Sequence, residues 1–229
     1  MNVLITGANR GLGLEFVKQL LDRGDTVIAT ARRPEAATEL QAMKAGAGER
    51  LTITQLDVDS PDDWCDLAGQ LSNTALDVLI NNAGAMVSSG TLGALNYDAI
   101  SACFNINTLG PLRGLEACLP ALRRGEGKKV ITITSKMGSM TDNTSGGAYG
   151  YRVSKSAVNS AMRSAAMDLK PDNFTVVVMH PGWVQTDMGG TNALIDIPTS
   201  ITGMLKVIDR VGPEETGSFW EWNDKQIGW

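Results

Sequence analysis

A tyrosine and a lysine, Tyr151 and Lys155, stand four residues apart in the segment AYGYRVSKSAVNSAM (148–162). The chain after Tyr151 contains no glycine or proline until Pro171, which predicts a helix over 151–169. Each residue of a helix turns by about 100°, so side chains four apart share a face and can touch. A nearby ammonium favours the phenolate and lowers the pKa of a phenol. Tyr151 and Lys155 are therefore a candidate acid–base pair.

A second tyrosine in this segment, Tyr149, is less suited to the chemistry. It lies six residues before Lys155 and beside glycines, so a helix extended back to it would place it on another face. We interpret it as a bystander. Tyrosine and lysine at this spacing also occur on ordinary solvated helix faces. The rest of the chain has to decide between these interpretations.

The composition indicates a single soluble globular domain over residues 1–229, with 43% apolar and 20% charged residues. No apolar run approaches the roughly 18 residues of a membrane span, and no signal peptide is visible. The three cysteines have no metal-ligand spacing, which favours reduced thiols. The net charge of −5 without a basic tract argues against nucleic-acid binding. We expect a cytoplasmic protein with no metal site and no membrane or nucleic-acid partner.

Short apolar runs alternate with helical patterns along the chain. This order predicts an α/β fold, a doubly wound parallel sheet of about seven strands between two layers of helices. Helices are expected over 11–24, 34–45, 60–71, 96–124 and 151–169, with Ser60 as an N-cap. Strands are expected over 2–6, 25–31, 51–58, 76–84, 128–135, 174–182 and 218–222.

A glycine-rich turn, TGANRGLG (6–13), lies between the first strand and the first helix. Doubly wound folds bind nucleotides at this place, where backbone N–H groups at a helix N-terminus meet a pyrophosphate. Glycines are also common in any tight turn, so the motif alone is weak. Its position between a strand and an amphipathic helix strengthens the prediction.

Four motifs in order, TGANRGLG, NNAG (81–84), YRVSK (151–155) and HPGWVQTDM (180–188), resemble those of the short-chain dehydrogenase/reductase family. The resemblance covers essentially the whole chain and implies a Rossmann-type fold with a dinucleotide cofactor. The residues that it assigns to cofactor binding are Gly7, Asn9, Arg10, Gly11, Leu12, Gly13, Arg32, Asp57, Val58, Asn82, Ala83, Gly84, Tyr151, Lys155, Pro181, Gly182, Val184 and Thr186.

The second strand predicts which dinucleotide is bound. Ala31 stands where an acid would bind a ribose 2′-hydroxyl, and Arg32 follows it. Arg10 lies in the glycine-rich turn, and two guanidiniums suit a 2′-phosphate. We therefore expect NADP(H); the alternative is that Arg32 and Arg33 are solvated surface charges. Asn81 is expected to tie neighbouring strands together.

The resemblance implies a catalytic set of Tyr151, Lys155, Ser135 and Asn107. Tyr151 would be the general acid in reduction, and Lys155 would hold the nicotinamide ribose. Ser135 ends a predicted strand but precedes Tyr151 by 16 residues, longer than the common spacing, so Ser139 is a rival. Asn107 would relay a proton through water, or it is a buried amide at a helix kink.

The substrate side is less defined by the sequence. A mostly apolar segment, 187–205, is expected to form a lid over the substrate. Side chains expected to line the pocket are Met137, Met140, Trp183 and Met188. His180, the only histidine, is expected to be structural. The short chain and its ending FWEWNDKQIGW resemble the C-factor-like or sniffer-type carbonyl reductase branch.

These features predict an NADPH-dependent reductase of a ketone, aldehyde or quinone. The alternatives are an alcohol or diol dehydrogenase running in the oxidative direction, and a low-turnover NADP(H)-binding signalling protein. The partner is expected to be a small-molecule carbonyl substrate. The resemblance also implies a homodimer or homotetramer.

Overall fold

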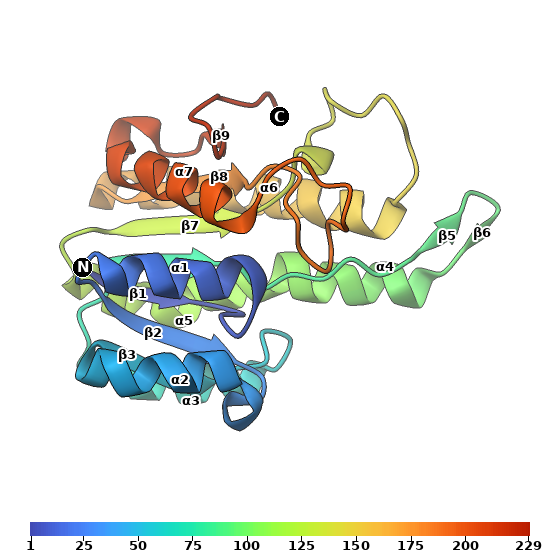
Figure 1. The fold of residues 1–229 in the computed structure, drawn as a ribbon. Coiled ribbons are helices and arrows are strands. Elements are labelled where there is room, and N and C mark those ends of the chain that lie inside the picture. Colours follow the sequence, from blue (N-terminus) through green and yellow to red (C-terminus); the bar gives the residue numbers. More distant parts are fainter.

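The computed structural model describes residues 1–229, which form one α/β domain around a seven-stranded sheet (Figure 1). The strand order is β3-β2-β1-β4-β7-β8-β9, and all neighbours are parallel. All seven expected strands are present, although several end earlier than predicted. They are β1 (Asn2–Ile5), β2 (Thr26–Ala31), β3 (Leu51–Gln55), β4 (Val78–Asn81), β7 (Lys129–Ile133), β8 (Thr175–His180) and β9 (Phe219–Glu221).

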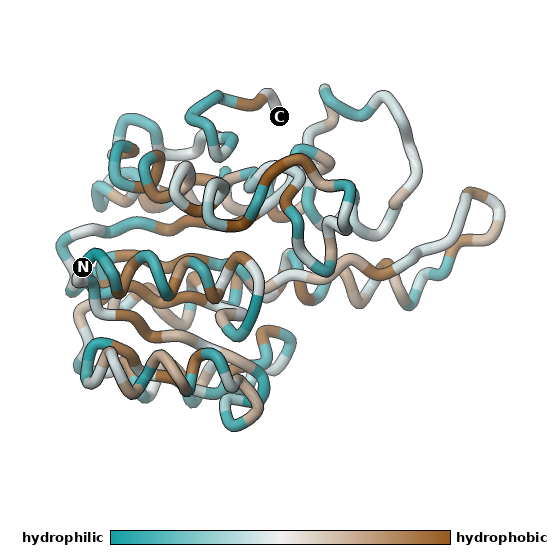
Figure 2. Tube along the Cα trace, viewed as in Figure 1, coloured by the Kyte–Doolittle hydropathy of each residue, from teal (hydrophilic) through white to brown (hydrophobic).

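Helices cover both faces of the sheet and bury two separate apolar clusters. One cluster is formed with α1 (Gly11–Asp22), α2 (Thr38–Ala47) and α7 (Ile197–Arg210). The other is formed with α3 (Pro61–Gln70), α5 (Gly110–Arg124) and α6 (Tyr149–Leu169). Figure 2 shows apolar residues concentrated along the strands between these helices. This is the predicted doubly wound, three-layer architecture.

The strand residues alternate between the two clusters. In β1, Val3 and Ile5 pack with α1, whereas Leu4 packs in the cluster on the opposite face. This alternation follows from the two-residue period of a strand. Burying each large aliphatic side chain contributes about 1.5–3 kcal/mol. The near-continuous apolar runs of the sequence are thus explained by a sheet that is covered on both faces.

The sheet reverses its order between β1 and β4, because β2 pairs on one side of β1 and β4 on the other. In such sheets the crevice at the carboxyl ends of the strands, at this switch point, is where ligands bind. The loops that follow β1, β4, β7 and β8 all begin at this edge. The loops after β1, β4 and β8 contain three of the four motifs found in the sequence, and the fourth, YRVSK, lies near the start of α6, which follows the loop after β7.

Three helix predictions differ from the structure, and the first is the helix over 34–45, which is divided into a 3₁₀ turn, Pro34–Ala36, and α2. The predicted helix over 96–124 is interrupted by a π-helical turn, Asn105–Leu109, between α4 (Tyr97–Phe104) and α5. Helix α6 begins at Tyr149 instead of Tyr151. Ser60 caps α3 as expected, since its Oγ accepts a hydrogen bond from the Asp63 N–H at 3.2 Å.

The lid predicted over 187–205 is wrong for its second half. Residues 197–205 belong to α7, and Ile201 and Met204 are fully buried against the sheet. The apolar residues that suggested a lid are therefore core residues, spaced for one helix face. Of the predicted lid, only residues 187–196 form a loop, and this loop ends at Asp196, the N-cap of α7.

A short hairpin, β5 (Gly90–Thr91) and β6 (Ala94–Leu95), projects beside α4 and was not expected from the sequence (Figure 1). No helix in the structure is long and apolar enough to cross a membrane.

Candidate active site

The glycine-rich turn joins β1 to α1 at the carboxyl edge of the sheet. Helix α1 begins at Gly11, and its N-cap Arg10 makes no side-chain capping bond. The first turn contains no acidic residue, so its N–H groups face no competing carboxylate. A phosphate group would be stabilised there by these N–H groups and by the helix dipole. The turn, including Asn9 and Leu12, therefore fits the dinucleotide site predicted for it.

The turn is held from behind by the loop after β4. Asn82 Nδ2 donates to the carbonyl oxygens of Thr6 and Gly7, at 2.9 and 3.0 Å. Thr6 Oγ1 accepts from the N–H groups of Asn82 and Ala83, both at 3.0 Å. A Cβ at Gly13 would lie 2.3 Å from the Gly7 oxygen, so only glycine fits this contact. Thr6 is a site-shaping residue that the sequence motifs did not single out.

Two arginines stand near the expected ribose end of the site. Arg32 follows the end of β2, is exposed, and makes no ion pair. Arg10 pairs with Asp187 of the loop after β8, and both side chains are exposed. Asp57 and Val58 follow β3, where Val58 packs against Gly110 at the start of α5. The geometry leaves the Arg32 guanidinium free for an anionic ligand.

Tyr151 and Lys155 lie on one face of α6, as their spacing predicts. The side chains are buried, and Lys155 Nζ is 5.8 Å from the centre of the Tyr151 ring. Lys155 Nζ donates to the Ile133 carbonyl oxygen at 2.9 Å. Helix α6 thereby presents the phenol and the ammonium at the carboxyl end of β7.

Burial dominates the electrostatics of this pair. It lowers the pKa of the Lys155 ammonium to about 8. It raises the pKa of the Tyr151 phenol, although a hydrogen bond with Ser135 opposes this rise. The sequence predicts that Lys155 lowers the phenol pKa, but the net shift in the structure is upward. Desolvation disfavours both charged forms and is here the larger effect.

The structure separates the two candidate serines. Ser135 follows β7, is buried, and lies close enough to Tyr151 for its hydroxyl to oppose the rise in the phenol pKa. Its Oγ also accepts from the Met137 N–H at 3.1 Å, so it is a turn cap as well. Ser139 Oγ instead donates to the Gly228 carbonyl oxygen at 2.7 Å. The tertiary fold therefore brings Ser135, and not Ser139, to Tyr151.

Asn107 lies in the π-helical turn and is 1% exposed. Its Oδ1 accepts from the Ala85 N–H, and its Nδ2 donates to the Ala85 oxygen, both at 2.8 Å. Nδ2 also donates to Ser154 Oγ at 3.0 Å, and the Ser154 hydroxyl donates to the backbone carbonyl oxygen of Tyr151. A Cβ at Gly84 would lie 3.2 Å from Asn107 Oδ1 and 3.6 Å from Lys155 Nζ. Asn107 thus joins the π-turn to the NNAG loop and to α6, as expected of a buried amide at a helix kink, and the proton relay stays a prediction.

The segment after β8 closes the site opposite the glycine-rich turn. Pro181 accepts a hydrogen bond at its oxygen from Ser200 Oγ at 2.6 Å, and Gly182 has a φ of +88°. Val184 is buried and pairs with Ile195 as an isolated bridge. Thr186 Cγ2 would lie 3.9 Å from a Cβ at Gly11. The segment therefore stands across from the start of α1, and its contact with the nicotinamide stays a prediction.

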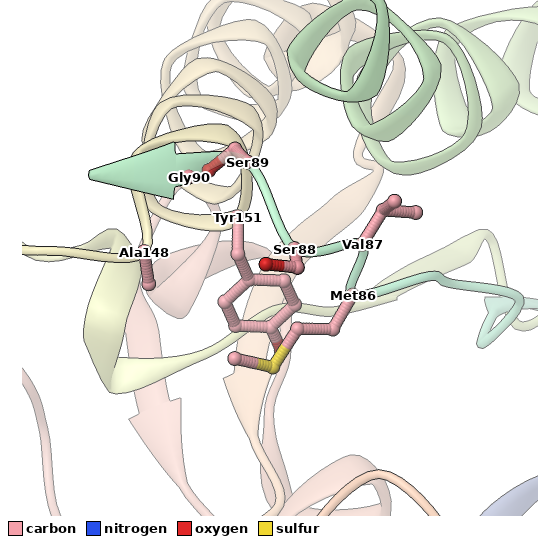
Figure 3. Close-up of a pocket in the computed structure, with 7 residues that line it drawn as sticks. All are labelled: Met86, Val87, Ser88, Ser89, Gly90, Ala148 and Tyr151. Carbon is pink, nitrogen blue, oxygen red and sulfur yellow. The ribbon is translucent and has the colours of Figure 1, made fainter. Parts of the chain in front are cut away.

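A pocket of about 420 Å³ opens beside Tyr151 (Figure 3). Figure 3 shows the Met86 side chain beside the Tyr151 ring. The sequence did not identify this wall, because nothing in residues 86–90 carries a chemical motif. The expected lining residues Met137, Met140, Trp183 and Met188 are absent from it. The pocket is lined by Met86, Val87, Ser88, Ser89, Gly90, Ala148 and Tyr151.

The expected pocket residues have other positions. Met140 is 77% exposed in the loop before α6. Trp183 is half-exposed, and its Nε1 donates to the Gly189 oxygen at 2.8 Å. Apolar residue type alone did not show which way these loops turn. No cluster of three or more His, Cys, Asp or Glu side chains is placed to hold a metal ion.

A model of the short chain dehydrogenase family matches residues 1–194 of the chain. The chain belongs to the short-chain dehydrogenase family. The motif resemblance found in the sequence is thereby confirmed, and with it membership in a family of oxidoreductases.

Relatives of this short-chain dehydrogenase include proteins with different descriptions. The C-signal of Myxococcus xanthus is 49% identical over 154 residues, 67% of this chain and 93% of the relative. The carbonyl reductase Sniffer of D. melanogaster has a TM-score of 0.93 and 35% identity, covering 100% of this chain and 99% of that one. NADPH-bound carbonyl reductase from chicken fatty liver has a TM-score of 0.92 and 34% identity, covering 100% and 94%.

The single histidine of this short-chain dehydrogenase lies at the end of β8. Its Nδ1 is buried without a hydrogen-bond partner, and burial lowers the His180 pKa to about 4. Its backbone oxygen accepts from the Trp222 N–H at 2.9 Å. This is the structural position expected for it.

We expect His180 to make the protein sensitive to acid. The unfolded chain binds the proton with the ordinary pKa of 6.5, whereas the folded chain binds it near 4. The contribution of neutral His180 to the free energy of unfolding is therefore fully present above pH 6.5. It falls by roughly 3 kcal/mol as the pH drops from 6.5 to about 4. Urea unfolding at several pH values should show this slope flattened in His180→Gln. Equal slopes in the two proteins would contradict the prediction.

Proposed function

We propose that the protein is an NADP(H)-dependent carbonyl reductase that converts a ketone, aldehyde or quinone into an alcohol. The observation that carries the proposal is that Ser135, Lys155 and Asn107 lie around Tyr151, which lines a pocket, at the sheet edge where the glycine-rich turn also begins. The carbonyl reductases among the structural neighbours support the same reaction class.

The dinucleotide would be held along the carboxyl edge of the sheet. The N–H groups at the start of α1 would bind the pyrophosphate, and Arg32 with Arg10 would bind the 2′-phosphate. Lys155 would bind the nicotinamide ribose, and Val184 with Thr186 would face the carboxamide. When bound, NADPH supplies the hydride that reduces the carbonyl carbon.

The protein's own side chains handle the proton. Tyr151 donates its phenolic proton to the carbonyl oxygen, and the Ser135 hydroxyl holds that oxygen in place. The phenol is protonated at neutral pH, as an acid must be before it can donate, because the ordinary pKa of tyrosine is about 10 and burial raises that of Tyr151 further. The Lys155 ammonium then stabilises the phenolate that remains. Asn107 holds the loop and the helix on which this arrangement depends.

The pocket suits an uncharged, apolar carbonyl compound. Tyr151 is the only ionisable side chain that lines it, and Met86 and Val87 supply apolar surface. A charged substrate would lose hydration there without gaining a partner.

Met86 is expected to set the substrate size. Met86→Ala removes the thioether beside Tyr151, so kcat/KM for a small ketone should fall about tenfold because apolar contact is lost. A bulky aromatic ketone should be affected less. Steady-state kinetics with both substrates measure this ratio. Met167→Ala, on an exposed methionine of α6, is the control, and an unchanged ratio in Met86→Ala would refute the assignment.

The proposal is tested by following NADPH absorbance across a panel of aldehydes, ketones, diketones and quinones. Turnover of any of them at a rate well above a Tyr151→Phe blank supports a reductase. Oxidation of alcohols in preference to reduction would favour the dehydrogenase direction instead.

One observation favours a second candidate function. The similarity to C-signal makes a low-turnover NADP(H)-binding signalling protein an alternative. NADPH binding by calorimetry without turnover of the panel would favour it. The homodimer or homotetramer implied by the family stays a prediction.

A further inference from the structure

The pocket wall, residues 86–90, and Ala85 just before it are hydrogen-bonded to helical elements. Ala85 is held by Asn107, and the Val87 N–H donates to Cys103 Sγ of α4 at 3.4 Å. Further along, the Gly150 N–H of α6 donates to Ser89 Oγ at 3.0 Å. The last of these bonds joins the wall to the residue immediately before Tyr151.

Ser89 is held by hydrogen bonds through both its backbone and its side chain. Its carbonyl oxygen accepts from the Asn96 N–H at 3.0 Å, which closes the base of the β5–β6 hairpin. Ser89 lines the pocket but is almost completely buried. Its hydroxyl oxygen accepts the hydrogen bond from the Gly150 N–H of α6. The oxygen that meets Gly150 is therefore held in place by the hairpin and not by α6 itself.

Helix α6 has no side-chain cap of its own. Ala148 stands at the N-cap with a left-handed φ of +45° and offers no oxygen beyond its backbone. The first N–H groups of a helix have no partner within the helix. Ser89 supplies one from a distant part of the chain. The approach is close, since a Cβ at Gly150 would lie 3.2 Å from Ile100 Cα and 3.3 Å from Ser89 Cβ.

We propose that Ser89 is a positioning residue, which caps α6 from the pocket wall and thereby sets the position of Tyr151. Without this oxygen, the buried Gly150 N–H loses its partner and the first turn of α6 loosens. Tyr151, the next residue, then samples positions from which proton donation is slow. The proposal deepens the proposed function and rests on it, because the readout is reductase turnover.

The test compares Ser89→Ala with the wild-type protein. The kcat for a carbonyl substrate should fall about tenfold, since a small misplacement of a catalytic group slows the reaction strongly. The KM for NADPH should stay within about twofold, because the glycine-rich turn is untouched. Amide hydrogen exchange without added cofactor should speed up in peptides covering residues 149–152.

Ser60→Ala is the matched control, because it also removes a serine cap, from α3. It should lower the melting temperature and leave kcat unchanged. Ser89→Cys is a second variant that keeps the side-chain size but replaces the oxygen by a weakly accepting sulfur. Its kcat should lie between those of wild type and Ser89→Ala.

A wild-type kcat in Ser89→Ala or in Ser89→Cys would overturn the proposal. The same drop in kcat for Ser60→Ala would also overturn it, since the effect would then be general destabilisation. Failure of the proposed function is a separate outcome, seen as absence of turnover in the wild-type protein itself.

Discussion

Tyr151→Phe is expected to reduce carbonyl turnover by about a thousandfold, near the middle of the range for loss of a general acid. The change removes only the hydroxyl and keeps the buried ring, so the pocket retains its shape. NADPH binding should be nearly unchanged, because most of its expected contacts lie on the glycine-rich turn and the loop after β8. Steady-state kinetics and calorimetric titration with NADPH measure the two effects.

Tyr149→Phe is the matched control for this experiment. Tyr149 begins the same helix two residues earlier and makes no side-chain hydrogen bond in the structure. It should keep the wild-type kcat. Comparable turnover in Tyr151→Phe and the wild type would remove Tyr151 from the proposed mechanism.

Arg32→Asp is expected to shift the preference from NADPH toward NADH by about a hundredfold in the ratio of kcat/KM values. The substitution removes a charge-assisted bond to the 2′-phosphate, and it adds a carboxylate that repels the phosphate and can bind a 2′-hydroxyl. The structure leaves the Arg32 guanidinium exposed and without an ion pair, so no internal contact is lost. Kinetics with both dinucleotides measure the ratio.

Arg33→Asp changes the net charge by the same amount at the neighbouring exposed position. It should alter the preference much less, because a direct contact and not the overall field is expected to discriminate. Equal shifts in the two variants would mean that Arg32 does not recognise the phosphate. The solvated-charge interpretation of this pair would then be preferred.

The predicted acid–base pair depends on connections between distant segments. Asn107 joins Ala85 to Ser154, and Ser154 bonds to the Tyr151 backbone. Ser89 reaches the same helix at Gly150. The pocket wall and α6 therefore form one hydrogen-bonded unit, in which the wall proposed to contact substrate is bonded to the helix of the proposed proton donor.

The features that arise from short-range geometry could be predicted from the sequence. Tyr151 and Lys155 share a face because four residues make about one helical turn. The seven strands were visible because a sheet covered on both faces needs nearly continuous apolar runs. The glycine-rich turn was recognisable because a strand, a turn and a helix must follow one another there.

Which distant residues meet depends on how the elements pack, and the sequence does not show this. Ser135 and Ser139 are equally polar, but β7 carries the first to Tyr151, while Gly228 takes the hydroxyl of the second. The apolar residues of 197–205 are compatible with a lid or with a core helix. In the structure they are buried against the sheet as part of α7. The pocket wall at 86–90 was invisible because its role comes from where the chain passes and not from its residue types. Burial likewise reversed the expected pKa shift of Tyr151, because desolvation depends on all the surrounding atoms.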